Sequence, residues 1–249
     1  MPQEPFFTIL KNRGKVIISG PDRYTFLQGL ITNDIYKLGE KKSLLYSCLL
    51  TPQGKFLYDF FISEEENNLI LDCEGHERAE NLEKVLSMYK LRANITFAHE
   101  KHTDVFAIFG APRGLADPRH SEMGYRSFEK PENVEERSFD SWDVHRIKLC
   151  IPDGSRDMIQ KNSTLLECHI DKLNGVSFDK GCYMGQELTA RTHYRGLIKK
   201  HLYTVTPDML DLDCLPAFGE PIERQGKIIG EMRSSCENIG LALLKDEAL

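Results

Sequence analysis

Three strand-like runs follow one another closely in the first third of the chain, and their spacing most constrains the fold. The runs are LLYSCLL at 44–50, KFLYDFFI at 55–62 and LILDC at 69–73. The turn residues TPQG at 51–54 join the first two runs, and the acidic stretch EEENN at 64–68 joins the last two. Because short connections join antiparallel neighbours, we predict an antiparallel meander.

A helix is expected directly after the meander, since apolar residues recur at helical spacing between residues 76 and 91. Before the meander we predict two strands, at 6–10 and 15–19, separated by a turn, and a short helix from Arg23. After the helix we predict two more strands around a turn at 99–102. Strands and covering helices alternate without a βαβ rhythm, which favours the α+β class.

The second half of the chain is expected to hold a connection and a small final lobe. Residues 111–136 are rich in proline, glycine and charge, so we place a connection there. A helix is predicted at 163–173 from its apolar spacing. Short strands with proline and glycine turns predict a β lobe at 201–249. Residues 1–200 then form one region of two interleaved α+β lobes.

The cysteines and the N-terminus bear on the compartment. Seven cysteines in 249 residues, with no CxxC pair, argue against a disulfide framework and predict a reducing compartment. The N-terminus shows no basic segment followed by an apolar run, and no stretch approaches the ~18 apolar residues of a membrane span. We therefore predict a cytoplasmic protein that does not contact membranes.

Charge is unevenly distributed along the chain. The net charge is −6, yet residues 172–201 hold six lysines and arginines against two acids, a local +4. The chain carries no GxxxxGK[ST], GxGxxG or HExxH motif, so nucleotide hydrolysis, dinucleotide binding and a stable metal site lack a sequence basis. The basic segment is therefore the main candidate for a functional site.

One loop within that segment, DKGCYMGQELTAR at 179–191, has the features of a reactive site. Gly181 and Gly185 allow sharp turns, and QELTAR favours a helix that begins after them. A thiol at Cys182, near Lys180 and a helix N-terminus, is placed where a thiolate is favoured. The structural alternative is a turn whose cysteine is merely small and buried.

The basic residues beyond this loop also have two interpretations. Arg191 and Arg195 suit the capture of carboxylates or phosphates, because a guanidinium binds such groups through two parallel hydrogen bonds. The alternative is a solvated basic face without a ligand.

Three stretches resemble one known family. KGCYMGQE at 180–187, with Ala190, Arg191 and Arg195, resembles the signature of the YgfZ-type folate-binding proteins, relatives of the glycine cleavage T-protein. FLQGLITND at 26–34 and the hairpin LLTPQGKFLYDFFI at 49–62 are similar to segments that these proteins share. GKIIGEMRSS and GLALL, between 226 and 244, are similar to their C-terminal barrel.

This resemblance implies a T-protein-like three-lobed ring of antiparallel sheets with covering helices, whose central hole admits tetrahydrofolate or a one-carbon derivative, plus a small C-terminal β-barrel lobe. It implies a folate-dependent factor that assembles or maintains iron–sulfur proteins, including enzymes that modify tRNA. In that role Cys182 acts as an activated thiolate beside Lys180, with a transient cluster contact at the thiol. The folate-binding residues it implies are Asn33, Asp59, Gly181, Tyr183, Gln186, Glu187, Arg191 and Arg195.

Two other functions stay open. A tetrahydrofolate-dependent aminomethyltransferase is the alternative, and the sequence leaves open whether the protein is an enzyme. Against it, the hairpin carries Tyr58-Asp59 where the T-proteins have two successive aspartates, and a phenol with pKa ~10 is a poor substitute for a carboxylate. An RNA-binding accessory protein, with a weak tRNA contact through the basic segment, is the third reading.

Overall fold

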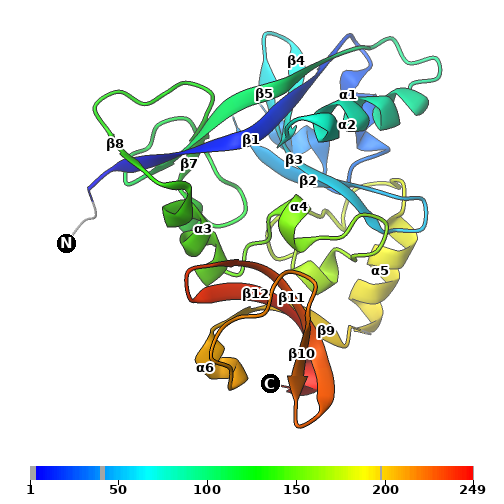
Figure 1. The fold of residues 1–249 in the computed structure, drawn as a ribbon. Helices are drawn as coiled ribbons and strands as arrows, with labels where there is room; N and C mark the ends of the chain where they lie inside the picture. Colours follow the sequence, from blue (N-terminus) through cyan, green and yellow to red (C-terminus); the bar gives the residue numbers. More distant parts are fainter. Residues whose placement is uncertain (1–3, 40–42, 197, 249) are drawn as a thin grey trace.

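The structure is a computed structural model that describes residues 4–39, 43–196 and 198–248. It contains a large sheet of eight strands and a smaller sheet of four (Figure 1). Helices cover one face of the large sheet, and the chain between residues 139 and 196 lies between the two sheets. This arrangement confirms the predicted α+β class of antiparallel sheets with covering helices.

The large sheet has the order β2-β3-β4-β1-β5-β7-β6. Strand β8 lies outside this order and pairs with β1 in the parallel direction. The predicted meander forms the first three strands of the sheet, which pair antiparallel in sequence order. The strands of this sheet are β1 (Phe6–Ser19), β2 (Leu45–Leu50), β3 (Phe56–Glu65), β4 (Asn68–Glu74), β5 (Thr96–Phe109), β6 (Leu115–Ala116), β7 (Tyr125–Ser127) and β8 (Glu135–Arg137).

The two faces of this sheet differ in chemistry because side chains alternate along each strand. One face is apolar and packs against α1 (Arg23–Gln28) and α2 (Glu77–Met88) through residues such as Val16, Ile62 and Leu71. The opposite face places charged side chains at paired positions, for example Asp72 of β4 opposite Lys15 of β1. The sheet therefore encloses an apolar core on one side and leaves a polar wall on the other.

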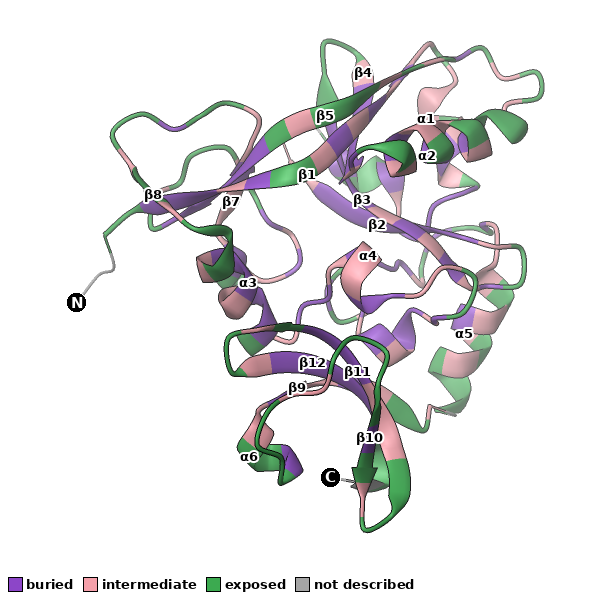
Figure 2. Cartoon of the chain, in the orientation of Figure 1, coloured by how far each residue is buried: buried purple, intermediate pink, exposed green. Residues whose placement is uncertain are grey.

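The segment between the sheets forms a second core with β2 and the first residues of β1. It contains α3 (Phe139–Lys148), α4 (Gly154–Asp157) and α5 (Gln186–Arg195), and its buried side chains include Trp142 and Ile170. Figure 2 shows that β2, whose six residues are all buried, lies inside this assembly, whereas much of α5 is exposed.

The small sheet has the order β10-β11-β12-β9 and forms the C-terminal lobe. A fully buried guanidinium ties it to the rest of the chain: Arg146 of α3 contacts Asp157 (2.7 Å) and the Ser234 hydroxyl (2.7 Å). Its elements are β9 (Lys200–Val205), α6 (Pro207–Leu210), β10 (Pro221–Arg224), β11 (Lys227–Cys236) and β12 (Ile239–Lys245).

Two predicted turns are wrong. The expected break in residues 12–14 is a bulge inside the single 14-residue strand β1, where the register with β5 shifts. A Cβ on Gly14 would lie 2.6 Å from the Glu100 carbonyl oxygen, so the glycine permits close strand packing there instead of a turn. Likewise, β5 runs without interruption through the expected turn at 99–102.

The predicted helix at 163–173 is also wrong, because only Leu166–Cys168 forms a 3₁₀ turn there. His169 follows in the left-handed region with φ 56°, which ends any helix. Apolar residues on several sides of this stretch are buried, Leu165, Ile170 and Leu173 among them, so tertiary packing rather than an amphipathic helix explains their spacing.

The helices and domain division complete the comparison. Helices α1, α2 and α5 form where the sequence predicts them. None of the described helices is long and apolar enough to cross a membrane. The residues at 111–136 add short strands to the large sheet. The division into 1–200 and 201–249 stays a prediction.

Candidate functional site

The loop that carries Cys182 is held against the end of α1 on both of its sides. The Ser177 N–H donates to the Thr32 carbonyl oxygen (3.0 Å), and the Met184 N–H donates to the Gly29 carbonyl oxygen (3.0 Å). These bonds join residues about 150 positions apart in the chain. They fix where the intervening loop, residues 178–183, leaves and re-enters the body of the protein.

Lys180 anchors the middle of this loop. Its side chain is buried, and its ammonium donates to the carbonyl oxygens of Gln28 (2.7 Å), Ile31 (2.8 Å) and Asn33 (2.8 Å). Burial lowers the pKa of this ammonium to about 8, and Asp34 opposes the shift. All three N–H donors are thus bonded to the backbone, so Lys180 positions the loop rather than pairing with the Cys182 thiol.

Cys182 differs from most other cysteines of the chain in its exposure. It is exposed, as is Cys214 of the C-terminal lobe. Burial raises the pKa of the other five thiols, which favours their protonated form. Those five are Cys48, Cys73, Cys150, Cys168 and Cys236. Within the loop, a Cβ on Gly181 would meet nothing within 4 Å, so the tip of the loop is open.

Two glycines set the start of α5 directly against the β2–β3 turn. Gly185 precedes the helix with φ 78°, and a Cβ there would lie 2.4 Å from the Thr51 carbonyl oxygen. A Cβ on Gly54 would lie 2.8 Å from the Gly185 carbonyl oxygen. The predicted role of glycine at 185, a sharp turn into a helix, is confirmed.

Five of the predicted site residues meet on the outer side of this contact. They line an open groove of about 590 Å³ between α5 and Pro52 at the tip of the turn. Tyr183 forms its inner wall and is buried, whereas most of the others are at the solvent edge. The five are Tyr183, Gln186, Glu187, Arg191 and Arg195.

Asn33 lies apart from this groove and is buried inside the protein. Its amide donates to the carbonyl oxygens of Tyr46 (2.9 Å) and Asn174 (2.6 Å), and its Oδ1 accepts from the Asp34 N–H. The side chain is therefore engaged within the fold, where it joins α1, β2 and the segment that leads to the Cys182 loop.

Asp59 also lies apart from the groove, in a cavity of about 310 Å³ on the polar face of the large sheet. The Tyr46 hydroxyl donates to its Oδ2 (3.1 Å). Burial raises the pKa of the Asp59 carboxyl, and Asp153 adds to the shift while Arg13 opposes it. Tyr58 packs in the apolar core on the other face of β3, so a carboxylate at that position would not reach this cavity.

Four arginines line this cavity, and none of them was predicted from the sequence as a site residue. Asp72 accepts from Arg13 (2.7 Å) and from Arg126 (2.5 Å), and these two guanidiniums hold the pKa of its carboxyl below the usual range although burial opposes this. Arg119 and Arg126 lie over the Phe61 ring, at 4.7 and 3.9 Å from its centre. One sequence signal for this cluster was available: Asp72 is a charged residue inside the otherwise apolar strand LILDC at 69–73.

Two side chains that line this cavity each carry a buried N–H group with no hydrogen-bond partner among the described residues. These groups are the Nε of Arg126 and the indole Nε1 of Trp142, and both residues are more than nine-tenths buried. Because an unpaired buried donor is costly, each donor is suited to an acceptor atom of a bound molecule. Together with Asp59 and the aromatic rings, they match the mixed lining that small-molecule sites have.

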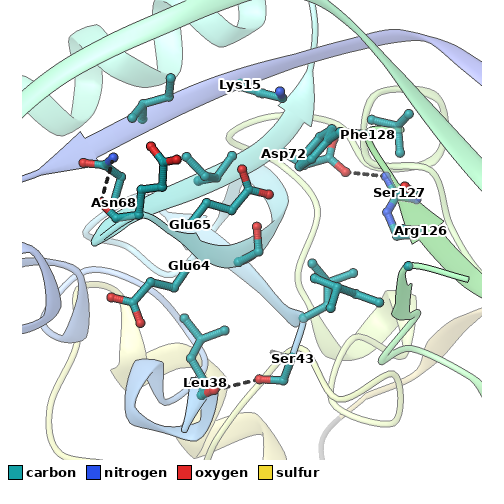
Figure 3. A pocket seen from close by; sticks show the side chains of 18 of the residues that line it. Lys15, Leu38, Ser43, Glu64, Glu65, Asn68, Asp72, Arg126, Ser127 and Phe128 are labelled. Carbon is teal, nitrogen blue, oxygen red and sulfur yellow. Dashed lines mark hydrogen bonds and ion pairs between the residues drawn. The ribbon is translucent and has the colours of Figure 1, made fainter. Parts of the chain in front are cut away.

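A larger pocket of about 960 Å³ lies farther along the same sheet face (Figure 3). Arg126 lines both spaces, and its ion pair with Asp72 stands at one wall of this pocket, as the close-up shows. Glu64 and Glu65 line the opposite side. Carboxylates line both spaces, but four arginines also line the smaller cavity, which therefore suits a ligand with carboxylate groups better than the larger pocket does.

No metal site accompanies these spaces in the described ranges, where no group of three or more His, Cys, Asp or Glu side chains could hold a metal ion.

Comparisons with known proteins identify the class of this scaffold. The crystal structure of glycine cleavage system aminomethyltransferase T from Bartonella henselae superposes with a TM-score of 0.72 over 97% of this chain and 78% of that one, at 12% identity. The family described as CAF17, C-terminal beta-barrel domain, matches residues 199–249. The fold is thus that of the T-protein class with a C-terminal β-barrel domain, as predicted.

Closer relatives define the family within that class. Iron-sulfur cluster assembly factor IBA57, mitochondrial, from Homo sapiens is 31% identical over 96% of this chain and 77% of its own length. The Mus musculus protein of that name is 32% identical over the same shares. The chain belongs to the IBA57 family of iron–sulfur cluster assembly factors.

These relatives correct one prediction and limit another. The cytoplasmic assignment is contradicted, because the human and mouse proteins are both named as mitochondrial. Its premise was weak: cysteine usage separates oxidising from reducing compartments but does not tell one reducing compartment from another. The resemblance to iron–sulfur factors with a T-protein-like fold is confirmed, whereas membership of the YgfZ group is not.

Replacing Lys180 by methionine should test its positional role. We expect Lys180→Met to lower the free energy of unfolding by about 2–4 kcal/mol, since three carbonyl oxygens lose a charged donor. The rate at which iodoacetamide alkylates Cys182 should change less than about threefold, because the ammonium does not pair with the thiol. Urea unfolding and alkylation kinetics measure the two effects, with the exposed Lys172→Met as control. A stable variant whose Cys182 reacts more than tenfold slower would contradict this assignment.

Proposed function

We propose that this chain is a folate-dependent factor in the assembly or maintenance of iron–sulfur proteins, with Cys182 as its reactive thiolate. The observation that carries the proposal is the exposed Cys182 on a loop that Lys180 and two backbone hydrogen bonds anchor. Iron and sulfide chemistry uses the thiolate form of cysteine, which requires access to solvent and to a partner.

Membership of the IBA57 family supports the iron–sulfur part of this proposal, since the relatives are named as cluster assembly factors. The burial of Cys48, Cys73 and Cys168 and the partial burial of Cys150 and Cys236 support the choice of Cys182. Cys182 then ligates an iron–sulfur unit in passing, and the cluster is cargo rather than a resident cofactor. Clients that modify tRNA belong to the proposal on the sequence resemblance alone.

The folate part is supported by the cavity around Asp59. The residues present fit a reduced pterin: Phe61 and Trp142 offer apolar surface, while Arg126 and Trp142 each offer an unpartnered N–H donor. Asp59 adds a carboxyl that hydrogen-bonds to Tyr46. When bound, tetrahydrofolate would supply a carrier for one-carbon units. The role of these side chains is to bind and orient the ring and to exclude water from it.

Replacing Cys182 tests the thiolate role. In cells that lack this protein, we expect Cys182→Ser to fail to restore the activity of iron–sulfur enzymes, because a hydroxyl is neither a thiolate ligand nor a comparable nucleophile. Cys214→Ser is the matched control, since that thiol is also exposed but lies in the C-terminal lobe, and it should restore activity. Full restoration by Cys182→Ser, at equal protein levels, would remove the thiolate role.

Folate binding can be followed through Trp142, which is the one tryptophan of the sequence and lines the cavity. We expect tetrahydrofolate to change the fluorescence of the indole on titration. Asp59→Asn should weaken binding about tenfold, because a hydrogen-bonding carboxyl is lost at constant size. The control Asp208→Asn, on α6, should bind as the unchanged protein does. An absence of any saturable signal, or equal affinities for both variants, would refute the folate assignment.

Aminomethyl transfer is the second candidate, favoured by the T-protein fold and by Asp59 facing the cavity. The tyrosine at position 58 does not argue against it, since that side chain lies on the opposite face of β3. If iron–sulfur assembly is the function, no methylenetetrahydrofolate should form above background when the protein is assayed with an aminomethylated lipoyl carrier protein. Steady turnover that depends on Asp59 would make transfer the primary function.

A further inference from the structure

Gly154, the first residue of α4, leaves free the space that a side chain would need beside Asp59. A Cβ at this position would overlap Asp59 Oδ1 and lie 2.5 Å from its Cγ and 3.0 Å from its Oδ2. The φ of Gly154 lies outside the left-handed region, so the backbone admits alanine, which favours helices more than glycine does. The neighbouring carboxyl, rather than the backbone conformation, therefore explains the glycine.

Tyr46 holds the Asp59 carboxyl from another direction. The Tyr46 hydroxyl donates to Oδ2 (3.1 Å), and the tyrosine side chain is fully buried. A methyl group on residue 154 would press on both carboxyl oxygens and so would disturb the bond from Tyr46. The carboxyl is thus fixed between a hydroxyl of β2 and the backbone of α4.

The far end of α4 is bonded to the C-terminal lobe through Asp157, which is fully buried. Its Oδ1 accepts from the Ser234 N–H (2.9 Å) and from the Ser234 hydroxyl (2.6 Å) of β11. Its Oδ2 accepts from Arg146 (2.7 Å) and from the Asp153 N–H (2.7 Å). Four donors satisfy a carboxylate that water does not reach, so α3 and β11 set the position of α4.

We propose that Gly154 is the contact through which the C-terminal lobe positions Asp59 in its cavity. The contacts run from Ser234 to Asp157, along the single turn of α4, and from Gly154 to the carboxyl. Asp153, the residue before Gly154, lines the same cavity, so α4 also forms part of the cavity wall. The inference rests on the proposed folate function for its ligand, whereas its geometry rests on hydrogen bonds and packing alone.

This arrangement gives the carboxyl a fixed direction in a cavity that also offers hydrogen-bond donors. Arg126 and Trp142, each with an unpartnered N–H, line the same space. A pterin ring donates and accepts hydrogen bonds along one edge, so it needs a carboxyl and donors at fixed positions. A carboxyl that is already oriented loses less freedom when the ligand binds. Gly154 is therefore a positioning residue that raises affinity through Asp59.

The first test needs no ligand and follows the titration of the Asp59 carboxyl by NMR in protein labelled with carbon-13 at aspartate. Burial raises the pKa of this carboxyl and Arg13 opposes the rise. Displacing the carboxyl from its packed position in Gly154→Ala should therefore lower the titration midpoint by about half a pH unit or more. The control Gly29→Ala adds a methyl group where nothing lies within 4 Å, at φ −81°, and should leave the midpoint unchanged.

Ser234→Ala tests the link to the C-terminal lobe in the same titration. It removes one of the four donors to Asp157 and should move the Asp59 midpoint in the same direction, although Ser234 lies outside the cavity lining. Ser235→Ala is the matched control, because this exposed serine is the next residue of β11. A midpoint that stays unmoved in Gly154→Ala or in Ser234→Ala would overturn the proposal.

A double-variant cycle covers the case in which Gly154→Ala folds poorly. In the unchanged background, Gly154→Ala should lower the thermal midpoint of unfolding by about 3 °C or more, because the methyl group is forced against the carboxyl. Asp59→Ala removes the atoms that this methyl would overlap, so in that background the shift should be less than about 1 °C. Equal shifts in the two backgrounds would show that the alanine acts elsewhere and would overturn the proposal.

Titration with tetrahydrofolate, followed through Trp142, connects the position of the carboxyl to binding. We expect Gly154→Ala to weaken binding about tenfold, and to change it less than about twofold when Asp59 is already alanine. The same weakening with and without Asp59 would overturn the inference. If the unchanged protein gives no saturable signal, the folate assignment fails, while the carboxyl titration still decides whether Gly154 positions Asp59.

Discussion

The three hydrogen bonds from the Lys180 ammonium are the interaction on which the candidate site depends. They satisfy carbonyl oxygens of Gln28, Ile31 and Asn33, where α1 ends and the chain turns toward β2. Peptide groups at a helix end need partners, and here a side chain from the distant loop supplies them. Together with the bonds from the Ser177 and Met184 N–H groups, which fix the loop on both sides, the Lys180 bonds hold the loop while Cys182 stays exposed. Hydrogen bonds that stabilise the fold thus also keep the Cys182 thiol accessible.

The large sheet provides the second constraint, because its two faces meet different surroundings. The apolar face is closed by α1 and α2, whereas the polar face carries Asp72 between two arginines and Asp59 under Tyr46. Buried charges persist only when paired, so these side chains form a network rather than a collapsed apolar core. The network leaves a cavity with unpartnered donors on Arg126 and Trp142. Thiol and cavity are therefore separate features of one scaffold, and we assign them the sulfur and the folate parts of the proposed function.

Much of the fold follows from local patterns, and the exceptions have physical causes. Short turns predicted the β2–β3–β4 meander, and Gly185 before a helix-forming run predicted α5. The apolar spacing at 163–173 predicted a helix wrongly, since burial from several sides gives the same pattern as an amphipathic face. The site residues were only partly predictable: Cys182 stands out by its neighbours, whereas the distance between Asp59 and the α5 groove depends on tertiary packing. The cavity arginines lie far apart in the sequence, and no local signal brings Arg13 and Arg126 together on Asp72.

Amide hydrogen exchange of the Cys182 loop tests the central claim most directly, namely that an anchored loop presents an open thiol. The Ser177 and Met184 amides donate to Thr32 and Gly29, so they should exchange only through the larger openings that also expose β2. The Gly181 and Cys182 amides should exchange at rates close to those of an unstructured peptide. This contrast, measured residue by residue by NMR, is what the account predicts. Equally fast exchange at Ser177 and Met184 would show that the loop is not anchored and would contradict it.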